Sequence, residues 1–234
     1  MTNEEIFELH KLQSANVRKL IQVKKNLIKD INFYLRKSDN FQVEIKTKLL
    51  ALLYCAWSEA QFIQIIYTPS CFSSSEIRSI KDTRGIAKGW KKMVNIAIQK
   101  VNFSEMSSDL QEKKDKLIEI IDEYIDKPHQ LRHKIAHGQW VYALNRDNDA
   151  RDPNLTSDLD QLDYIQIWKQ FEVHQYLGSI IRDLVQSPNK GFNNNYLSNI
   201  TQLENYLDKT TDWNIATRKE ILLLKPIRGK TENP

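Results

Sequence analysis

Glycine and proline are scarce in this sequence, with only six of each in 234 residues. These two residue types interrupt regular secondary structure most strongly, and a fold made of short strands needs them at its many turns. Their scarcity therefore disfavours a strand-and-turn fold. Leucine, isoleucine, lysine, glutamine and glutamate are abundant instead, so the sequence predicts an all-α protein with long helices.

Cysteine and long apolar runs are scarce as well. The two cysteines, Cys55 and Cys71, lack metal-ligand spacing and cannot build a disulfide framework, so a reducing cytosol suits them. The N-terminus is acidic where a signal peptide would be basic. The nearest candidate for a membrane span, 49–66, is interrupted by polar residues such as Glu59. We therefore predict a soluble, cytoplasmic protein that makes no contact with a membrane.

The charge balance is mildly basic. Lysine and arginine outnumber aspartate and glutamate by 34 to 30, which gives a formal net charge of +4. This balance permits binding to a polyanion without requiring it. Hydrophobic residues make up 41% of the chain, which is enough for a substantial buried core and argues against disorder.

Apolar residues recur at helical spacing over most of the chain. We predict helices over 4–37, 41–67, 75–101, 108–125, 162–186, 196–208 and 213–224. The segment 41–67 is apolar around most of its circumference, which indicates the central buried helix. Residues 187–195 are rich in Ser, Pro, Asn and Gly, so we predict a linker there. The chain is accordingly divided into a helical domain, 1–188, and a C-terminal helical extension, 189–234.

A short helix is predicted over 128–137. A new helix is expected to begin at Lys127-Pro128, after a break in the chain's helical structure, and to end at Gly138. Proline suits the first turn of a helix, and glycine suits the position just after its end. The run that follows, 139–144, is the one segment with a strand-like pattern. With the polar loop 145–154 it predicts a small β-hairpin.

Three of the five histidines lie within nine residues, at positions 129, 133 and 137. Their spacing of four places them on one face of a helix, and Arg132 lies beside them. A guanidinium binds phosphate through two parallel hydrogen bonds, and an imidazole exchanges protons near neutral pH. Together they can cleave RNA without a metal: the base activates the 2′-hydroxyl and the cation stabilises the charged transition state.

The run Leu-Arg-His-Lys-Ile-Ala-His-Gly-Gln-Trp, 131–140, resembles the Arg-x4-6-His signature of the HEPN superfamily, in particular its bacterial nuclease branch. The resemblance implies a HEPN-like helical bundle over 1–188. It also implies a homodimer in which two motifs share one cleft, and a metal-independent endoribonuclease that needs no cofactor. Arg132 and His137 would then be the catalytic pair, with His133 as a polar supporter and Glu59 as an acidic residue of the cleft.

Family members often belong to toxin–antitoxin or anti-phage defence systems, so the resemblance implies RNA as substrate and an antitoxin or defence protein as partner. A toxin subgroup carries tyrosine two residues after the motif histidine, where this chain has Gln139. Control by nucleotidylation of that tyrosine is therefore not expected. Some HEPN domains are not catalytic, so the alternative is a module that binds nucleic acid, a nucleotide or a protein partner.

Four further residues are candidates for contact with RNA: Lys134, Arg84, Lys88 and Trp140. Each also has a structural interpretation, because lysines most often form solvated faces and a tryptophan after the motif often packs a hairpin. Glu59 could likewise neutralise a buried arginine such as Arg84 or Arg132.

The three histidines also raise the alternative of a zinc hydrolase, since catalytic zinc uses three protein ligands and a water. Histidines stepping along one helix span roughly 12 Å, however, which is too far to close on a single ion. We therefore predict no metal at this site. His129, directly after Pro128, is expected to be a surface or capping residue.

Overall fold

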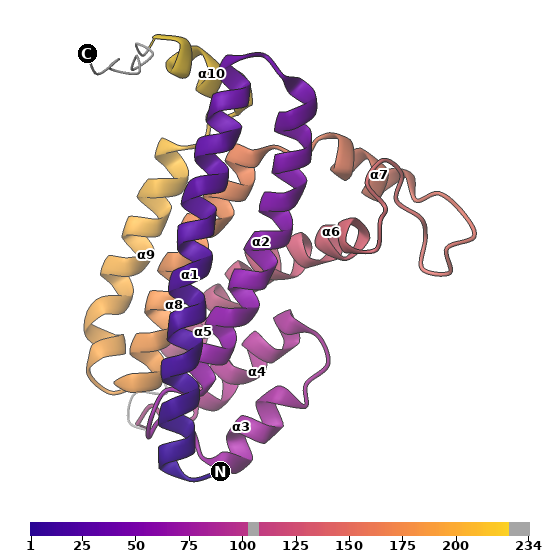
Figure 1. The fold of residues 1–234 in the computed structure, drawn as a ribbon. Coiled ribbons are helices and arrows are strands. Elements are labelled where there is room, and N and C mark those ends of the chain that lie inside the picture. Colours follow the sequence, from indigo (N-terminus) through magenta and orange to yellow (C-terminus); the bar gives the residue numbers. More distant parts are fainter. Residues whose placement is uncertain (103–107, 225–234) are drawn as a thin grey trace, which may run out of the picture.

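The computed structural model describes residues 1–102 and 108–224, and these confirm the all-α prediction (Figure 1). The first two helices, α1 (Asn3–Arg36) and α2 (Asn40–Ile66), form an antiparallel pair along the length of the bundle. Thr2 and Glu5 cap the start of α1 reciprocally, and the Asp39 side chain caps α2. Both helices lie within a residue of their predicted bounds.

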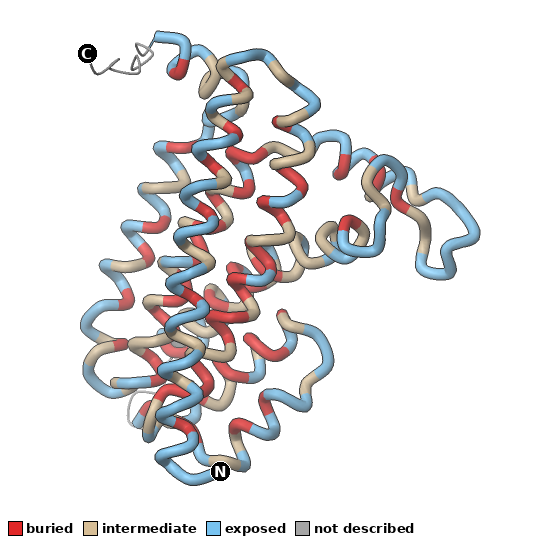
Figure 2. Tube along the Cα trace, viewed as in Figure 1, coloured by how far each residue is buried: buried red, intermediate tan, exposed pale blue. Residues whose placement is uncertain are grey.

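Helix α2 is the central helix of the bundle, as predicted. Its side chains at Leu50, Tyr54 and Trp57 are at most 1% exposed, and buried positions run along most of its length in Figure 2. Among the described helices, α2 has the length and composition to cross a membrane, but 61% of the qualifying window is buried inside the protein. That burial is typical of the core helix of a soluble protein.

The single helix predicted over 75–101 is wrong. The chain forms α3 (Ser74–Lys81), breaks, and then forms α4 (Ile86–Ile98). The break falls at Gly85, whose φ of +93° is a left-handed conformation that side chains disfavour. Gly85 was the available signal for this interruption, although a second glycine of the same segment, Gly89, lies inside α4.

The helix predicted over 128–137 is confirmed to within a residue as α6 (Lys127–Ala136), with Pro128 in its first turn, but the expected break before it is absent. Helix α5 (Ser108–Ile121) continues through a π-helical turn, Asp122–Asp126, directly into α6. The backbone N–H of Lys127 donates to the carbonyl of Asp122, five residues earlier. This wider turn accommodates Pro128, so the chain crosses the proline without leaving the helix.

No β-strand is present in the described residues, so the predicted hairpin after the motif is wrong. Residues 139–152 form a loop with one isolated bridge, between Leu144 and Arg151. Val141 and Tyr142 are almost 60% exposed and no second strand covers them. The loop leads into α7 (Pro153–Asp160), a helix that the sequence analysis did not predict.

The last helices are α8 (Tyr164–Gln186), α9 (Gly191–Lys209) and α10 (Ile215–Leu224). The predicted linker is too long, because α9 already begins at Gly191 and Phe192 is fully buried. Helix α9 packs beside α8 and shares one apolar core with α4 and α5. The final ten residues of the C-terminal extension, 225–234, lie outside the described residues.

Candidate functional site

Helix α6 carries the histidines and projects from the side of the bundle, where it contacts α2 (Figure 1). Ile135 is 1% exposed and belongs to the same apolar core as Tyr54 and Trp57 of α2, with Leu131 packed against it. Because these two residues are four apart, they lie on one face of α6 and direct it towards the bundle. The rest of the helix surface is left for polar side chains.

The end of α6 is fixed by Gly138, which has a φ of +80°. The N–H of Gly138 donates to the Ile135 carbonyl at 3.2 Å, and that of Gln139 donates to the Lys134 carbonyl at 3.0 Å. This pair of bonds is the Schellman motif, in which a left-handed glycine closes the helix. The predicted stop is therefore confirmed, and His137 is the C-cap residue.

A groove of about 980 Å³ lies along α6. All three histidines of the helix line it, as the spacing of four requires. The opposite side is formed by Gly85 and Ile86 at the start of α4 and by residues of the loop before α7. No side chain caps the first N–H groups of α4, and such groups attract anions.

The charges along the groove are mixed. Lys134 and Arg146 contribute two cations, and Asp126 and Asp152 contribute two carboxylates. The Lys134 ammonium also donates to the carbonyl of Leu144 at 2.5 Å, which holds the loop against α6. The fixed charges of the lining therefore balance, so they give the groove no strong preference for an anion or a cation.

His133 and His137 form the accessible pair. Both are exposed, and their ring centroids are 4.4 Å apart with the ring planes tilted by 57°. Desolvation, followed by the positive charges of His137, Lys134 and Arg132, lowers the pKa of His133. Two imidazoles at this separation can accept one proton and donate another to the same substrate.

Arg132 does not line the groove. Its guanidinium Nη2 lies 3.7 Å from Oε1 of Glu59 on α2, with 34% of the arginine side chain and 45% of the glutamate side chain exposed. The same carboxylate oxygen lies 3.7 Å from Nε2 of His129. The structure thus places Arg132 and Glu59 on the α2 side of the helix, and His133, Lys134 and His137 on the groove side. His129 contacts Glu59 and also lines the groove.

The expectation that His129 is a surface or capping residue is wrong. Its side chain is only 11% exposed, and Nδ1 lies 2.7 Å from the Ile125 carbonyl. Burial lowers the pKa of His129, although the Ile125 hydrogen bond and Glu59 oppose that shift. His129 follows the π-turn so closely that it packs between α6 and α2 at the inner end of the groove.

The candidate RNA contacts outside α6 occupy different positions. Arg84 and Lys88 are exposed and flank the two α4 residues that line the groove. Trp140 is half-buried, and its indole N–H donates to the Ile135 carbonyl at 2.9 Å. The ammonium of Lys48 lies 5.9 Å from the centre of the Trp140 ring. The indole therefore ties the loop to α6 and α2.

Several groove residues were not predicted from the sequence, among them Arg146 and the start of α4. Arg146 lies in the polar loop, where nothing in the local pattern indicates which direction its side chain takes. The contribution of Gly85 and Ile86 depends on a long-range approach between α4 and α6. The glycine signalled a break in the helix, but not the neighbour that the break would face.

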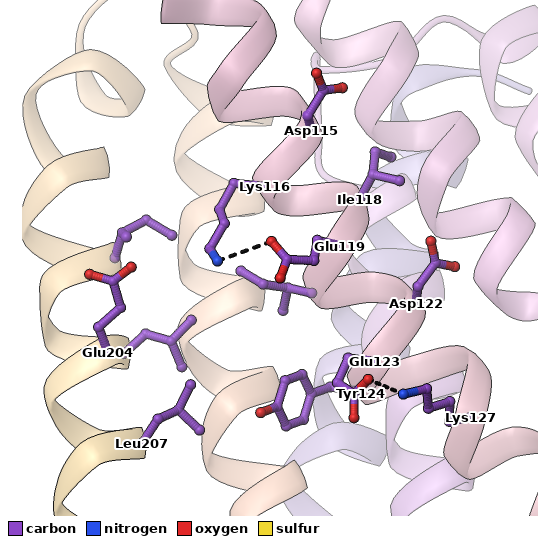
Figure 3. Close-up of a pocket in the computed structure, with 13 residues that line it drawn as sticks. Asp115, Lys116, Ile118, Glu119, Asp122, Glu123, Tyr124, Lys127, Glu204 and Leu207 are labelled. Carbon is purple, nitrogen blue, oxygen red and sulfur yellow. Dashed lines mark hydrogen bonds and ion pairs between the residues drawn. The ribbon is translucent and has the colours of Figure 1, made fainter.

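A second hollow, of about 720 Å³, lies between α5, the π-turn and α9 (Figure 3). Its lining includes five carboxylates and only two lysines, Lys116 and Lys127. The carboxylates are those of Asp115, Glu119, Asp122, Glu123 and Glu204. Each lysine is paired with a carboxylate of the same hollow. This negative surface repels phosphate, so the α6 groove is the better candidate for binding nucleic acid.

Within the described residues, no group of three or more His, Cys, Asp or Glu side chains is placed to hold a metal ion. Comparison with known proteins gives no match to a protein family, a curated protein or a solved structure.

Proposed function

We propose that this protein is a metal-independent endoribonuclease that cleaves RNA in the α6 groove. The observation that carries the proposal is the pair of exposed imidazoles, His133 and His137, 4.4 Å apart in a groove that also contains Lys134 and Arg146. The resemblance of 131–140 to the HEPN motif supports the same activity. A cytoplasmic toxin–antitoxin or anti-phage role, with an antitoxin or defence protein as partner, is part of this proposal.

The chemistry needs only groups of the chain and of the substrate. A neutral imidazole accepts the proton of the 2′-hydroxyl, and the resulting oxygen nucleophile attacks the adjacent phosphorus. The bond from phosphorus to the 5′-oxygen breaks, and a protonated imidazole donates a proton to that leaving oxygen. The products are a 2′,3′-cyclic phosphate and a 5′-hydroxyl end. The lowered pKa of His133 favours its neutral form and therefore the role of base.

In this proposal, Arg132 of one protomer contributes to the catalytic site of a second copy of the chain. In one protomer its guanidinium faces Glu59 rather than the groove. A two-fold dimer that brings two α6 helices together would set Arg132 of one protomer against His137 of the other. The guanidinium would then stabilise the charge that develops on the phosphate oxygens.

The decisive assay compares an oligoribonucleotide with its 2′-deoxy counterpart in excess EDTA. We expect the RNA alone to be cut, leaving a cyclic phosphate. His137→Ala and His133→Ala should each lower the rate by about 10²- to 10⁴-fold, the usual contribution of a general acid or base. His10→Ala is the matched control, because His10 lies on α1 and does not line the groove. Failure to cleave any RNA, with or without a cognate partner, would refute the proposal.

The shared cleft is tested by mixing two inactive variants, Arg132→Ala and His137→Ala. If the arginine and the histidine come from different protomers, half of the randomly mixed dimers contain one intact pair, and about a quarter of the wild-type activity returns. Sedimentation must show that both variants still dimerise. Dimers that exchange subunits but recover no activity would contradict the composite site.

The alternative is a binding module without catalysis. It is consistent with Arg132 lying outside the groove within one protomer, apart from His133 and His137. Such a module would bind RNA without cutting it. Arg132→Ala would then weaken binding, while His137→Ala would change it little.

A further inference from the structure

Pro128, two residues after the π-turn Asp122–Asp126, removes the α-helical donor of one backbone carbonyl in that turn. In an α-helix, the N–H of each residue donates to the carbonyl four residues earlier. The carbonyl of Tyr124 would therefore pair with residue 128, but Pro128 has no N–H. A buried carbonyl without a donor costs about 1–3 kcal/mol, so this turn needs a partner from elsewhere.

That partner is Tyr54 of α2, seventy residues earlier in the chain. Its hydroxyl donates to the carbonyl of Tyr124, and the side chain of Tyr54 is completely buried. The aromatic rings of Tyr54 and Phe171 of α8 pack in a T-shaped arrangement, with their centroids 5.0 Å apart. The central helix therefore supplies the donor that the proline removes.

The same Tyr54 hydroxyl also forms a hydrogen bond with His174 of α8. Its Nδ1 lies 3.1 Å from the Tyr54 oxygen. A tyrosine hydroxyl has only one proton, and that proton is committed to Tyr124. His174 must therefore donate from Nδ1, which makes it the Nδ1–H tautomer. Its Nε2 is then an acceptor, and it has no hydrogen-bond partner among the described residues.

The position of His174 is itself fixed by close packing. The imidazole is fully buried, and its ring centroid lies 4.8 Å from that of Trp57 and 5.2 Å from that of Trp90. A chain of contacts thus runs from α8 through Tyr54 to the π-turn and on to α6. A π-turn adds one residue to the helix, and one residue corresponds to about 100° of rotation.

We propose that Tyr54 and His174 are positioning residues, which hold the π-turn in place and thereby set the face of α6 that presents His133 and His137 to the groove. If the turn closed into regular α-helix, the helix beyond it would rotate and Ile135 would leave the core. The catalytic part of this inference rests on the proposed ribonuclease activity. The structural part does not.

Three variants separate hydrogen bonding from simple packing. Tyr54→Phe removes the hydroxyl and keeps the ring. His174→Leu fills the space without a donor, whereas His174→Asn places an amide N–H close to the position of Nδ1. We expect Tyr54→Phe and His174→Leu to lower kcat by about 10- to 100-fold, as a misplaced catalytic group does, with KM within about twofold. His174→Asn should restore most of kcat.

Nuclear magnetic resonance gives a readout that is independent of activity. Tyr54→Phe and His174→Leu should shift the ring signals of His133 and His137 and increase amide exchange across 122–136, while His174→Asn should leave both close to wild type. The ring nitrogen shifts of His174 should show the proton on Nδ1. Circular dichroism confirms that each variant folds; if His174→Leu does not, Tyr54→Phe and His174→Asn still decide.

The inference is overturned if folded Tyr54→Phe leaves the α6 signals unchanged, if His174→Asn behaves like His174→Leu, or if the proton lies on Nε2. If the wild type cleaves no RNA but the α6 signals respond as expected, the ribonuclease proposal fails and the positioning inference stands. If the wild type cleaves RNA and the α6 signals do not respond, the positioning inference fails and the ribonuclease proposal stands.

Discussion

Acidification from pH 7 to pH 4.5 is expected to cost the protein about 3 kcal/mol of folding free energy through His174 alone. The side chain is fully buried, and its pKa is lowered to about 3, chiefly by desolvation and further by the nearby His129 and Arg182. In the unfolded chain a histidine titrates near 6.5. Between these two values the unfolded state binds a proton that the folded state does not.

The direction and the size of this stability change follow from the difference between the folded and unfolded pKa of His174. A depressed histidine pKa contributes stability that is complete above pH 6.5 and is lost as the pH falls towards the folded value. Each unit of pH in this window is worth about 1.4 kcal/mol. At pH 4.5, two units below the unfolded value, the loss is therefore about 3 kcal/mol, and near pH 3 it reaches about 4 kcal/mol.

Urea unfolding of the wild type and of His174→Asn at the two pH values provides the measurement. Asparagine does not titrate, so the variant should lose about 3 kcal/mol less between pH 7 and pH 4.5. The packing cost of the substitution is present at both pH values and cancels, as do other groups such as Glu76, whose pKa is lowered in the folded state. Equal losses in the two proteins would show that His174 is not held neutral in the core.

Two substitutions test other features of the fold. Gly138→Ala should destabilise the protein by about 1–2 kcal/mol in urea unfolding, because the φ of +80° is strained for alanine although its Cβ would meet no atom within 4 Å; an unchanged stability would contradict the Schellman ending of α6. Glu172→Gln should cost about 1–2 kcal/mol, because it leaves the ammonium of Lys24, whose side chain is 9% exposed and which lies 2.8 Å from Glu172, without its counter-ion. That figure is reduced from the value for a fully buried pair because Glu172 is 31% exposed. Glu8→Gln, in a fully solvated pair, is the control and should change nothing measurable; equal effects of the two would refute the argument.

The long helices were predictable because their apolar periodicity reflects real burial. Helices α1, α2 and α8 each exceed twenty residues, so the pattern repeats often enough to outweigh local exceptions. Short elements carry less signal. Helix α7 spans eight residues, and its start at Asp152-Pro153 combines an N-cap and a first-turn proline that sequence rules recognise. Those signals lay within a stretch assigned to a loop on its polarity.

The errors near the motif have a different origin, which is tertiary. The strand-like run 139–144 forms no strand, since no second strand lies beside it in the described part of the chain. Pro128 predicts a break before α6 because local rules consider only the hydrogen bond that proline loses. The structure replaces that bond with one from Tyr54, and no local pattern links two residues seventy positions apart.

The arrangement of the three histidines in the candidate site was predictable because it follows from the helix that carries them. A spacing of four placed the three histidines on one face, and the groove confirms that placement. The degree of burial along that face was not predictable, because His129 is covered by α2 while His133 and His137 are exposed. The pairing of Glu59 with Arg132, one of two interpretations of that glutamate, is also seen.

The pairing of Arg132 with Glu59 does not oppose a catalytic role for the arginine. The two charges are 3.7 Å apart and both side chains are more than a third exposed, so the pair contributes at most about 1 kcal/mol. A phosphate that accepts two hydrogen bonds from the guanidinium in a desolvated cleft gains about 1.5–3 kcal/mol for each bond to a charged group. If the proposed ribonuclease activity holds, bound RNA would therefore outcompete Glu59 for the guanidinium. Until then the ion pair would restrict the conformations of Arg132, which would lower the entropic cost of ordering it.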